Sequence, residues 1–329
     1  MPLDHYVSQV HLRRFYSPAL RNRMYAIRKT DLKAFTPDSE SVCRIMDGST
    51  NAYLREDRAI EDFLKTIEPN YNAALEKLIA GKIDNECIYT IAGFVAYVVT
   101  CSPAGMRINS LPLKGAVETQ AAMMDAQGEF PPPPAELGGA SLTELLRDGV
   151  VEVTIDPKYP QAIGIDSILK FVAIFGNSTW EILHNDSDDC PFFTSDFPAA
   201  IEKTDEPLIL NRVVPLAPNL ALRIRPDPTF NRGQLDFAKF GYRKRTLAHA
   251  ELVRLNRLIV RCAEDTVLYR DDHPWVRPFA SKNRHYRIEA HIRRLATPTG
   301  TLQVSTQRIV VRAPSVENQP VPLSQDRDD

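Results

Sequence analysis

Glycine is scarce in this chain, and its cysteines follow no recognisable pattern. The 329 residues include only 14 glycines but 25 prolines, a balance that favours ordered, rigid connections over flexible linkers. The five cysteines are odd in number and far apart, and no Cys-x-x-Cys occurs. This spacing excludes a disulfide framework and a zinc ribbon. We therefore expect buried, reduced thiols and a cytoplasmic location.

Long apolar runs and the common nucleotide and hydrolase motifs are missing as well. The longest apolar run, IYTIAGFVAYVVTC (88–101), is too short to cross a bilayer and is typical of a buried core helix. The N-terminus lacks the apolar core of a signal peptide. No G-x-x-x-x-G-K-[ST], G-x-G-x-x-G, G-x-S-x-G or H-E-x-x-H occurs. The sequence thus predicts no membrane partner and gives no support for a glycine-rich nucleotide loop.

Charge is nearly balanced overall but unevenly distributed along the chain. The formal net charge is −2, yet residues 221–300 carry 17 Lys and Arg against 8 Asp and Glu. Such a basic region is compatible with binding nucleic acid or another phosphate-bearing ligand. It is equally compatible with neutralisation by the acidic remainder, because arginines of folded domains usually lie on solvated faces or in ion pairs.

The hydrophobic pattern changes from helical to strand-like along the chain. Residues 55–68 carry an apolar stripe at helical spacing, and 85–101 is apolar most of the way round. After residue 176, short β-rich runs follow, interrupted by one clear helix over 245–263. The sequence therefore predicts an α+β fold, in which a helix-rich N-terminal half packs on a mainly antiparallel β-sheet crossed by one long helix.

The same pattern predicts a simple domain organisation. We expect a single domain over residues 1–312. The four prolines of GEFPPPPAELGGAS (128–141) favour an extended loop, which we interpret as an insertion. The polar, proline-bearing end over 313–329 is typical of a disordered tail.

The N-terminal stretch DHYVSQVHLRRF (4–15) holds the first candidate site residues. The pattern predicts a short helix capped by Ser8. If one helix runs through the stretch, His5 and Gln9 share a face; if it begins near Ser8, His5 lies on an extended lead-in. Histidine suits proton transfer, and Arg14 suits binding of a phosphate or carboxylate. The simpler alternative is an amphipathic helix with a hydrogen-bonded histidine and solvated arginines.

A second candidate is the acidic flank of the helix predicted over 55–68. Asp57, Glu61 and Glu68 would lie close together on one side of this helix, next to its apolar stripe. Carboxylates in such an array can hold a divalent metal ion or act as a general base. The alternative is a solvated flank in which Glu61 pairs with Lys65.

The third candidate lies in PFFTSDFPAAIEK (191–203), where an apolar strand runs into Thr194, Ser195 and Asp196. Polar residues at the end of a buried strand are a common place for site chemistry. Asp196 would act as a base or ligand, and Ser195 as a donor or nucleophile. The alternative is an Asx or Ser turn that closes a hairpin.

The stretches HYVSQVHLRRF, FFTSDFPAAIE and VPLAPNLALRI, in this order, resemble the bacterial family called domain of unknown function 4238. Its members typically open H-Y-V-P-Q-x-x-L-R-x-F, continue with F-x-T-S-D-x-P and P-L-S/T-P, and carry a later helix with an asparagine, here Asn256. The chain departs at Ser8, where the family has proline, and at Ala217, where it has Ser or Thr. The resemblance implies no reaction. It implies that the N-terminal and Thr-Ser-Asp motifs belong to one design and meet in one pocket.

Three hypotheses of function remain open. The first is a hydrolase, such as a metal-dependent phosphodiesterase or nuclease in a defence or toxin system. Its site would consist of His5, Gln9, Arg14, Glu61, Glu68, Ser195 and Asp196. The second is a non-catalytic module that binds nucleic acid or protein through the basic residues of 221–300. The third is a buried polar network that ties the N-terminal helix to the sheet. Substrate, metal and oligomeric state are not specified by the sequence.

Overall fold

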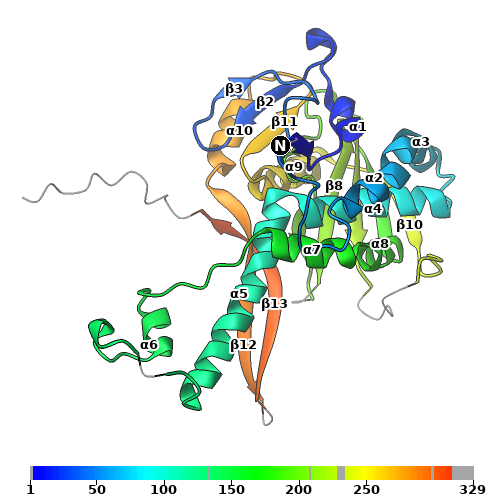
Figure 1. Ribbon diagram of the computed structural model, residues 1–329. Helices are drawn as coiled ribbons and strands as arrows, with labels where there is room; N and C mark the ends of the chain where they lie inside the picture. Colours follow the sequence, from blue (N-terminus) through cyan, green and yellow to red (C-terminus); the bar gives the residue numbers. More distant parts are fainter. Residues whose placement is uncertain (1–2, 132, 207–208, 228–233, 298–299, 313–329) are drawn as a thin grey trace, which may run out of the picture.

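The computed structural model describes residues 3–131, 133–206, 209–227, 234–297 and 300–312. Helices dominate the chain up to residue 176, and most of the long strands follow (Figure 1). The predicted α+β fold is thereby confirmed. The tail predicted over 313–329 lies outside the described residues.

The largest sheet has five strands in the order β10-β5-β9-β8-β7. These strands are β5 (Thr179–His184), β7 (Ala200–Lys203), β8 (Leu210–Ala217), β9 (Leu220–Arg225) and β10 (Gly241–Thr246). Neighbours run antiparallel except β10 and β5, which are parallel. The sheet is thus mainly antiparallel, as the sequence predicts. The sequence analysis missed β10, because its residues GYRKRT show no apolar alternation.

Helices gather on both sides of this sheet (Figure 1). The helices before it are α1 (Gln9–Leu12), α2 (Ala59–Ile67), α3 (Tyr71–Ala80), α4 (Asn85–Cys101), α5 (Pro103–Ala126), α6 (Leu142–Arg147), α7 (Lys158–Asp166) and α8 (Ile168–Gly176). Later in the chain, α9 (His249–Cys262) packs on β7, and α10 (Val276–Asn283) packs on α9. The helix predicted over 245–263 therefore starts later than expected, because its first residues end β10.

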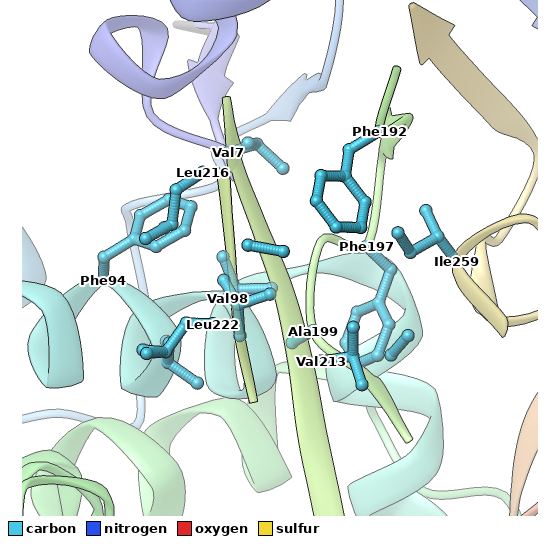
Figure 2. Close-up of a cluster of buried hydrophobic side chains, with 14 of the residues drawn as sticks. Val7, Phe94, Val98, Phe192, Phe197, Ala199, Val213, Leu216, Leu222 and Ile259 are labelled. Atoms are coloured by element: carbon cyan, nitrogen blue, oxygen red, sulfur yellow. The ribbon is translucent and has the colours of Figure 1, made fainter. Parts of the chain in front are cut away.

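Apolar side chains from both halves of the chain form one core (Figure 2). Phe94 and Val98 of α4 face the strand residues Leu216 and Leu222. Val213 belongs to the same cluster, together with residues that come from beyond the sheet: Phe192, Phe197 and Ile259. Because α4 is buried along nearly its whole length, it is the central core helix that its composition predicts.

A second, four-stranded sheet brings distant parts of the chain together. Its order is β3-β2-β11-β6, with β3 (Ala34–Phe35), β2 (Tyr25–Arg28), β11 (Thr266–Tyr269) and β6 (Thr194–Ser195). The Thr-Ser-Asp motif therefore pairs with β11, next to the N-terminal strand β2. A separate pair joins β1 (Leu3–His5) to β4 (Arg44–Met46).

Helix α5 and a long hairpin form an arm that projects from the body (Figure 1). The hairpin consists of β12 (Tyr286–Thr297) and β13 (Gly300–Val311), which pair antiparallel. The predicted insertion over 128–141 contains one turn of 3-10 helix, Ala135–Leu137, before α6 begins at its capping box. Among the described residues no single helix has both the length and the apolarity to cross a bilayer. Helices α4 and α5 meet that criterion only when they are taken together, in the part of the chain that the structure describes, and they are bent by 63° at their junction.

Candidate functional site

The N-terminal and Thr-Ser-Asp motifs meet through His11, a residue that the sequence analysis did not single out. Its Nε2 lies 2.9 Å from Thr194 Oγ1, 183 residues away in the chain, and its Nδ1 lies 2.8 Å from the Tyr71 hydroxyl. The ring is fully buried and stacks on Phe94, with the centroids 4.7 Å apart. Burial lowers the pKa of His11 to about 3. A neutral imidazole therefore links the two hydroxyls.

The Asp196 carboxylate binds the backbone at the start of β11. Its Oδ1 accepts a hydrogen bond from the Glu264 N–H at 2.8 Å, and its Oδ2 accepts from Asp265 and Thr266, each at 2.8 Å. Burial raises the pKa of Asp196 to about 6, against the opposing effect of the Asp265 and Thr266 N–H groups and the Lys29 cation. This carboxylate therefore holds the turn that follows α9.

Hydrogen bonds hold the segment before Asp196 on two sides. Ser195 Oγ accepts from the Phe197 N–H at 3.1 Å, which is the geometry of a Ser turn. From α9, Asn256 Oδ1 accepts from the Phe193 N–H at 3.0 Å, and its Nδ2 donates to the Pro191 carbonyl at 2.9 Å. The asparagine that the family resemblance singles out thus fixes the strand that carries the Thr-Ser-Asp motif.

The remaining N-terminal candidates form no hydrogen bond or ion pair with Asp196 in the described part of the chain. His5 lies on the extended strand β1, as the second sequence alternative expects, and its buried Nε2 has no hydrogen-bond partner in the described part of the chain. Gln9 Oε1 accepts from Arg13 Nη2 at 3.0 Å, whereas Arg14 is exposed. Over the described ranges, no hydrogen bond or ion pair joins His5 to Asp196.

The acidic flank is broken up by turns, which corrects the single helix predicted over 55–68. Helix α2 begins only at residue 59, because the Asp57 carbonyl accepts from the Asn51 N–H and closes a turn. Glu61 pairs with Arg58, whose guanidinium holds the pKa of that carboxyl below its usual range. Glu68 follows α2 in a 3-10 turn and accepts from Ser8 Oγ at 2.5 Å.

The structure also bears on the cap predicted at Ser8 and on a metal site at the carboxylates. Ser8 occupies the N-cap position of α1 but makes no capping hydrogen bond, because its hydroxyl donates to Glu68 instead. Within the residues that the structure describes, no group of three or more His, Cys, Asp or Glu side chains is placed to hold a metal ion.

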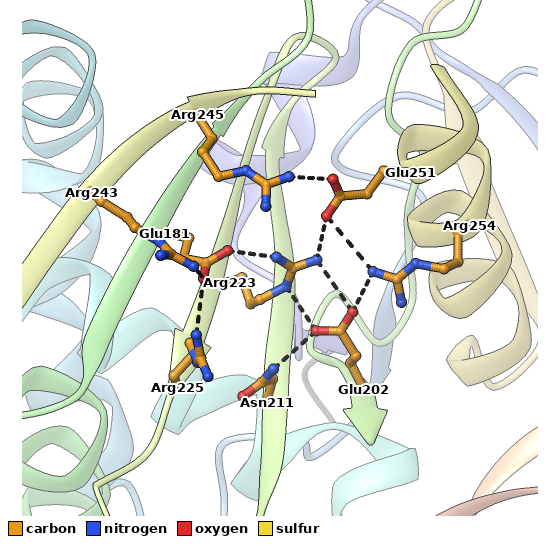
Figure 3. A network of polar contacts seen from close by, with 9 residues as sticks. All are labelled: Glu181, Glu202, Asn211, Arg223, Arg225, Arg243, Arg245, Glu251 and Arg254. Atoms are coloured by element: carbon orange, nitrogen blue, oxygen red, sulfur yellow. Dashed lines mark hydrogen bonds and ion pairs between the residues drawn. The ribbon is translucent and has the colours of Figure 1, made fainter. Parts of the chain in front are cut away.

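Charged side chains collect on the α9 side of the five-stranded sheet (Figure 3). Cross-strand register places Glu181 between Arg223 and Arg243. Because side chains alternate along a strand, the residues two positions further on, Arg225 and Arg245, share this face. Helix α9 adds an acidic and a basic side chain from its first turns. We call this group the arginine cluster: Arg223, Arg225, Arg243, Arg245 and Arg254 with Glu181, Glu202 and Glu251.

Arg223 forms the centre of the arginine cluster. Its guanidinium contacts Glu181 at 2.5 Å, Glu202 at 2.7 Å and Glu251 at 2.9 Å. The Arg223 side chain is 7% exposed and that of Glu181 only 2%. Burial alone would raise the pKa of Glu181, but hydrogen bonds from Arg243 and Arg223 hold it below its usual value. We call Arg223 and its three glutamates the inner part of the cluster. Each of these charges is stabilised in a mainly buried position by its opposite partner.

The outer arginines of the cluster keep much of their surface in water. The side chains of Arg225, Arg243, Arg245 and Arg254 are between 38% and 56% exposed. They line an open cavity of about 360 Å³, whose rim also holds Lys203, Asp205 and Glu206. Asn211 lies in this cavity too: its Nδ2 donates to Glu202 at 3.0 Å, and its buried Oδ1 has no donor among the described residues.

Composition left open whether the basic residues of 221–300 bind a ligand or are neutralised within the fold. In the arginine cluster, the inner charges are paired and mainly buried. Each outer guanidinium group also pairs with a glutamate but remains partly exposed to solvent. Two of its three carboxylates, Glu181 and Glu202, come from outside the basic region.

Comparison with known proteins gives one match. A family model described as a protein of unknown function (DUF4238) matches residues 4–273. No curated protein and no solved structure matches the chain. The matched region contains both motifs that His11 joins, Asn256 and the whole arginine cluster, and it ends before the β12–β13 hairpin. Because the match covers most of the chain, this protein belongs to the DUF4238 family.

Proposed function

We propose that the protein binds nucleic acid, with the outer arginines of the arginine cluster contacting phosphate groups of the strand. The observation that carries this proposal is the half-exposed state of four guanidinium groups around one open cavity. Planar guanidinium groups bind phosphate oxygens through paired hydrogen bonds and are less strongly hydrated than lysine ammonium groups.

The charge and polarity of the cavity support this assignment. Six cationic side chains against five carboxylates line the cavity and give it a net charge of +1. The amide of Asn211 and the hydroxyl of Thr204 add uncharged polar groups to the lining. The hydrolase hypothesis has no comparable support, because the Asp196 and Ser195 oxygens that it requires accept backbone hydrogen bonds.

The proposal is tested with the double variant Arg243→Gln, Arg254→Gln. Both substitutions leave partners on the buried carboxylates, since Glu181 keeps Arg223 and Glu202 keeps Arg223 and Asn211. Fluorescence anisotropy with a labelled 20-nucleotide single strand, of DNA and of RNA, measures the dissociation constant. We expect the double variant to bind at least about tenfold more weakly than the native protein.

Arg55→Gln, Arg147→Gln is the matched control, because it removes the same charge from exposed positions outside the cavity. Its affinity should equal that of the native protein. Unlabelled duplex, mononucleotide and inorganic phosphate serve as competitors, and an oligonucleotide should displace the probe at far lower phosphate concentration than a mononucleotide. Equal weakening in both double variants, or equal competition by mononucleotide, would refute the proposal.

A further inference from the structure

A second cavity lies where the projecting arm meets the body of the protein. It has a volume of about 460 Å³, a size typical of small-molecule sites. Helix α8 and strand β8 supply one side, and α5 and β13 of the arm supply the other. It is separate from the arginine cluster, because the strand register places Arg212 opposite Ile224 and Arg223 opposite Val213, on the other face of the sheet.

Arg212 is the basic residue that lines this cavity, and Asp227 is an acidic one. Arg212 Nη1 donates to the Ala199 carbonyl at 3.2 Å, and Arg212 Nη2 donates to Gln307 Oε1 at 2.6 Å. Both acceptors are neutral, and no carboxylate forms an ion pair with Arg212 among the described residues. Burial lowers the pKa of Arg212 to about 10. Arg223, by contrast, is surrounded by three glutamates.

The walls around Arg212 are mainly apolar. Phe171, Ile174 and Phe175 of α8 face Ile108 and Pro112 of α5 across the cavity. Besides Arg212, the polar lining residues are Asn109, Asp227 and the β13 segment Ser305–Gln307. A cavity with largely apolar walls, a guanidinium group that forms no ion pair and a few other polar groups is typical of a site for a small amphipathic ligand.

We propose that this cavity binds an apolar monocarboxylate, with the carboxylate on Arg212 and the hydrocarbon or aryl body against α8 and α5. Such a ligand supplies Arg212 with an ion-pair partner, because a guanidinium group can bind both oxygens of a carboxylate. Its apolar part removes the exposed surface of the α8 and α5 side chains from water. Since the cavity lies between the arm and the body, a bound ligand contacts both.

Octanoate is a suitable probe, and isothermal calorimetry on the full chain measures its binding. Octanol, which has the same chain length without the charge, should bind at least about tenfold more weakly, because it forms no ion pair with Arg212. Arg212→Met should reduce octanoate affinity by a similar factor. Arg257→Met, which removes an exposed arginine of α9 outside this cavity, should leave octanoate affinity unchanged.

A blocking variant keeps the test decisive if Arg212→Met fails to fold. Ser305→Trp places a large side chain at an exposed position of the cavity and should abolish octanoate binding without altering Arg212. The Arg243→Gln, Arg254→Gln variant should bind octanoate normally, so this proposal and the proposed nucleic-acid function are tested independently. The proposal is overturned if octanoate shows no saturable binding, if octanol binds equally well, or if Ser305→Trp binds octanoate as the native protein does.

Discussion

His11 shows how a residue on an apolar stripe can be the link between two motifs. His11 lies four positions after Val7 and four positions before Phe15, and all three side chains are buried on one face of the N-terminal segment. This spacing can be read from the sequence. The residues that hydrogen-bond to His11 cannot. Tyr71 and Thr194 reach His11 only through tertiary packing.

The buried imidazole makes the stability of the protein depend on pH. Between its unfolded pKa of 6.5 and its folded pKa of about 3, the unfolded chain binds a proton on His11 that the folded protein does not. Stability is therefore lost as the pH falls, by about 2–3 kcal/mol at pH 4.5. Urea unfolding from pH 7 to 4.5 should show this decline, and His11→Gln, which does not titrate, should reduce it by that amount. If the free energy of unfolding falls equally with pH in the native protein and in His11→Gln, the link between His11 and the pH dependence is contradicted.

The Asp196 carboxylate should contribute mainly to stability. Asp196→Ala leaves the N–H groups of residues 264–266 without their acceptor, and we expect the free energy of unfolding to fall by about 3 kcal/mol or more. Asp38→Ala is the control, because Asp38 accepts two backbone hydrogen bonds in an exposed turn and should cost less than about 1 kcal/mol. Urea unfolding measures both changes, and equal losses would refute a structural role for Asp196.

At the scale of elements, the predicted helices and strands reflect apolar periodicity. Helix α4 and the strands β8 and β9 were predictable because their buried faces are rich in apolar side chains. Strand β10 was not, because Arg243 and Arg245, which face the arginine cluster, are charged and partly exposed, and their partners Glu181 and Glu251 lie elsewhere in the chain. The order of the sheet, with β10 parallel to β5, depends on packing that periodicity does not encode.

The arginine cluster should be held together by its central member. Arg223→Met leaves Glu181, Glu202 and Glu251 without their common partner, and we expect the free energy of unfolding to fall by about 3–5 kcal/mol. Arg225→Met removes a half-exposed partner of Glu181 and should cost about 1 kcal/mol or less. Thermal or urea unfolding compares the two. A similar loss in both variants would show that the inner and outer arginines are not distinct.

At the scale of the whole molecule, composition indicated a basic region without showing how its charge is used. The excess of arginine in 221–300 is visible in the sequence, but two of the three glutamates that pair with Arg223, Glu181 and Glu202, lie earlier in the chain. The candidate hydrolase residues could be named from local motifs, yet their partners are backbone groups and side chains that only the fold brings near. The cavity beside the arm has no sequence signal, because α5, α8, β8 and β13 contribute to it from separate segments.

The most direct test of the proposed function is the salt dependence of nucleic-acid binding. Each phosphate that a protein cation neutralises contributes about −0.7 to the slope of log K against log salt for a single strand. We predict a clearly negative slope for the native protein between about 50 and 300 mM KCl. For Arg243→Gln, Arg254→Gln, the slope should be shallower by about 1.4. An unchanged slope in this variant would contradict the assignment of these arginines as phosphate contacts.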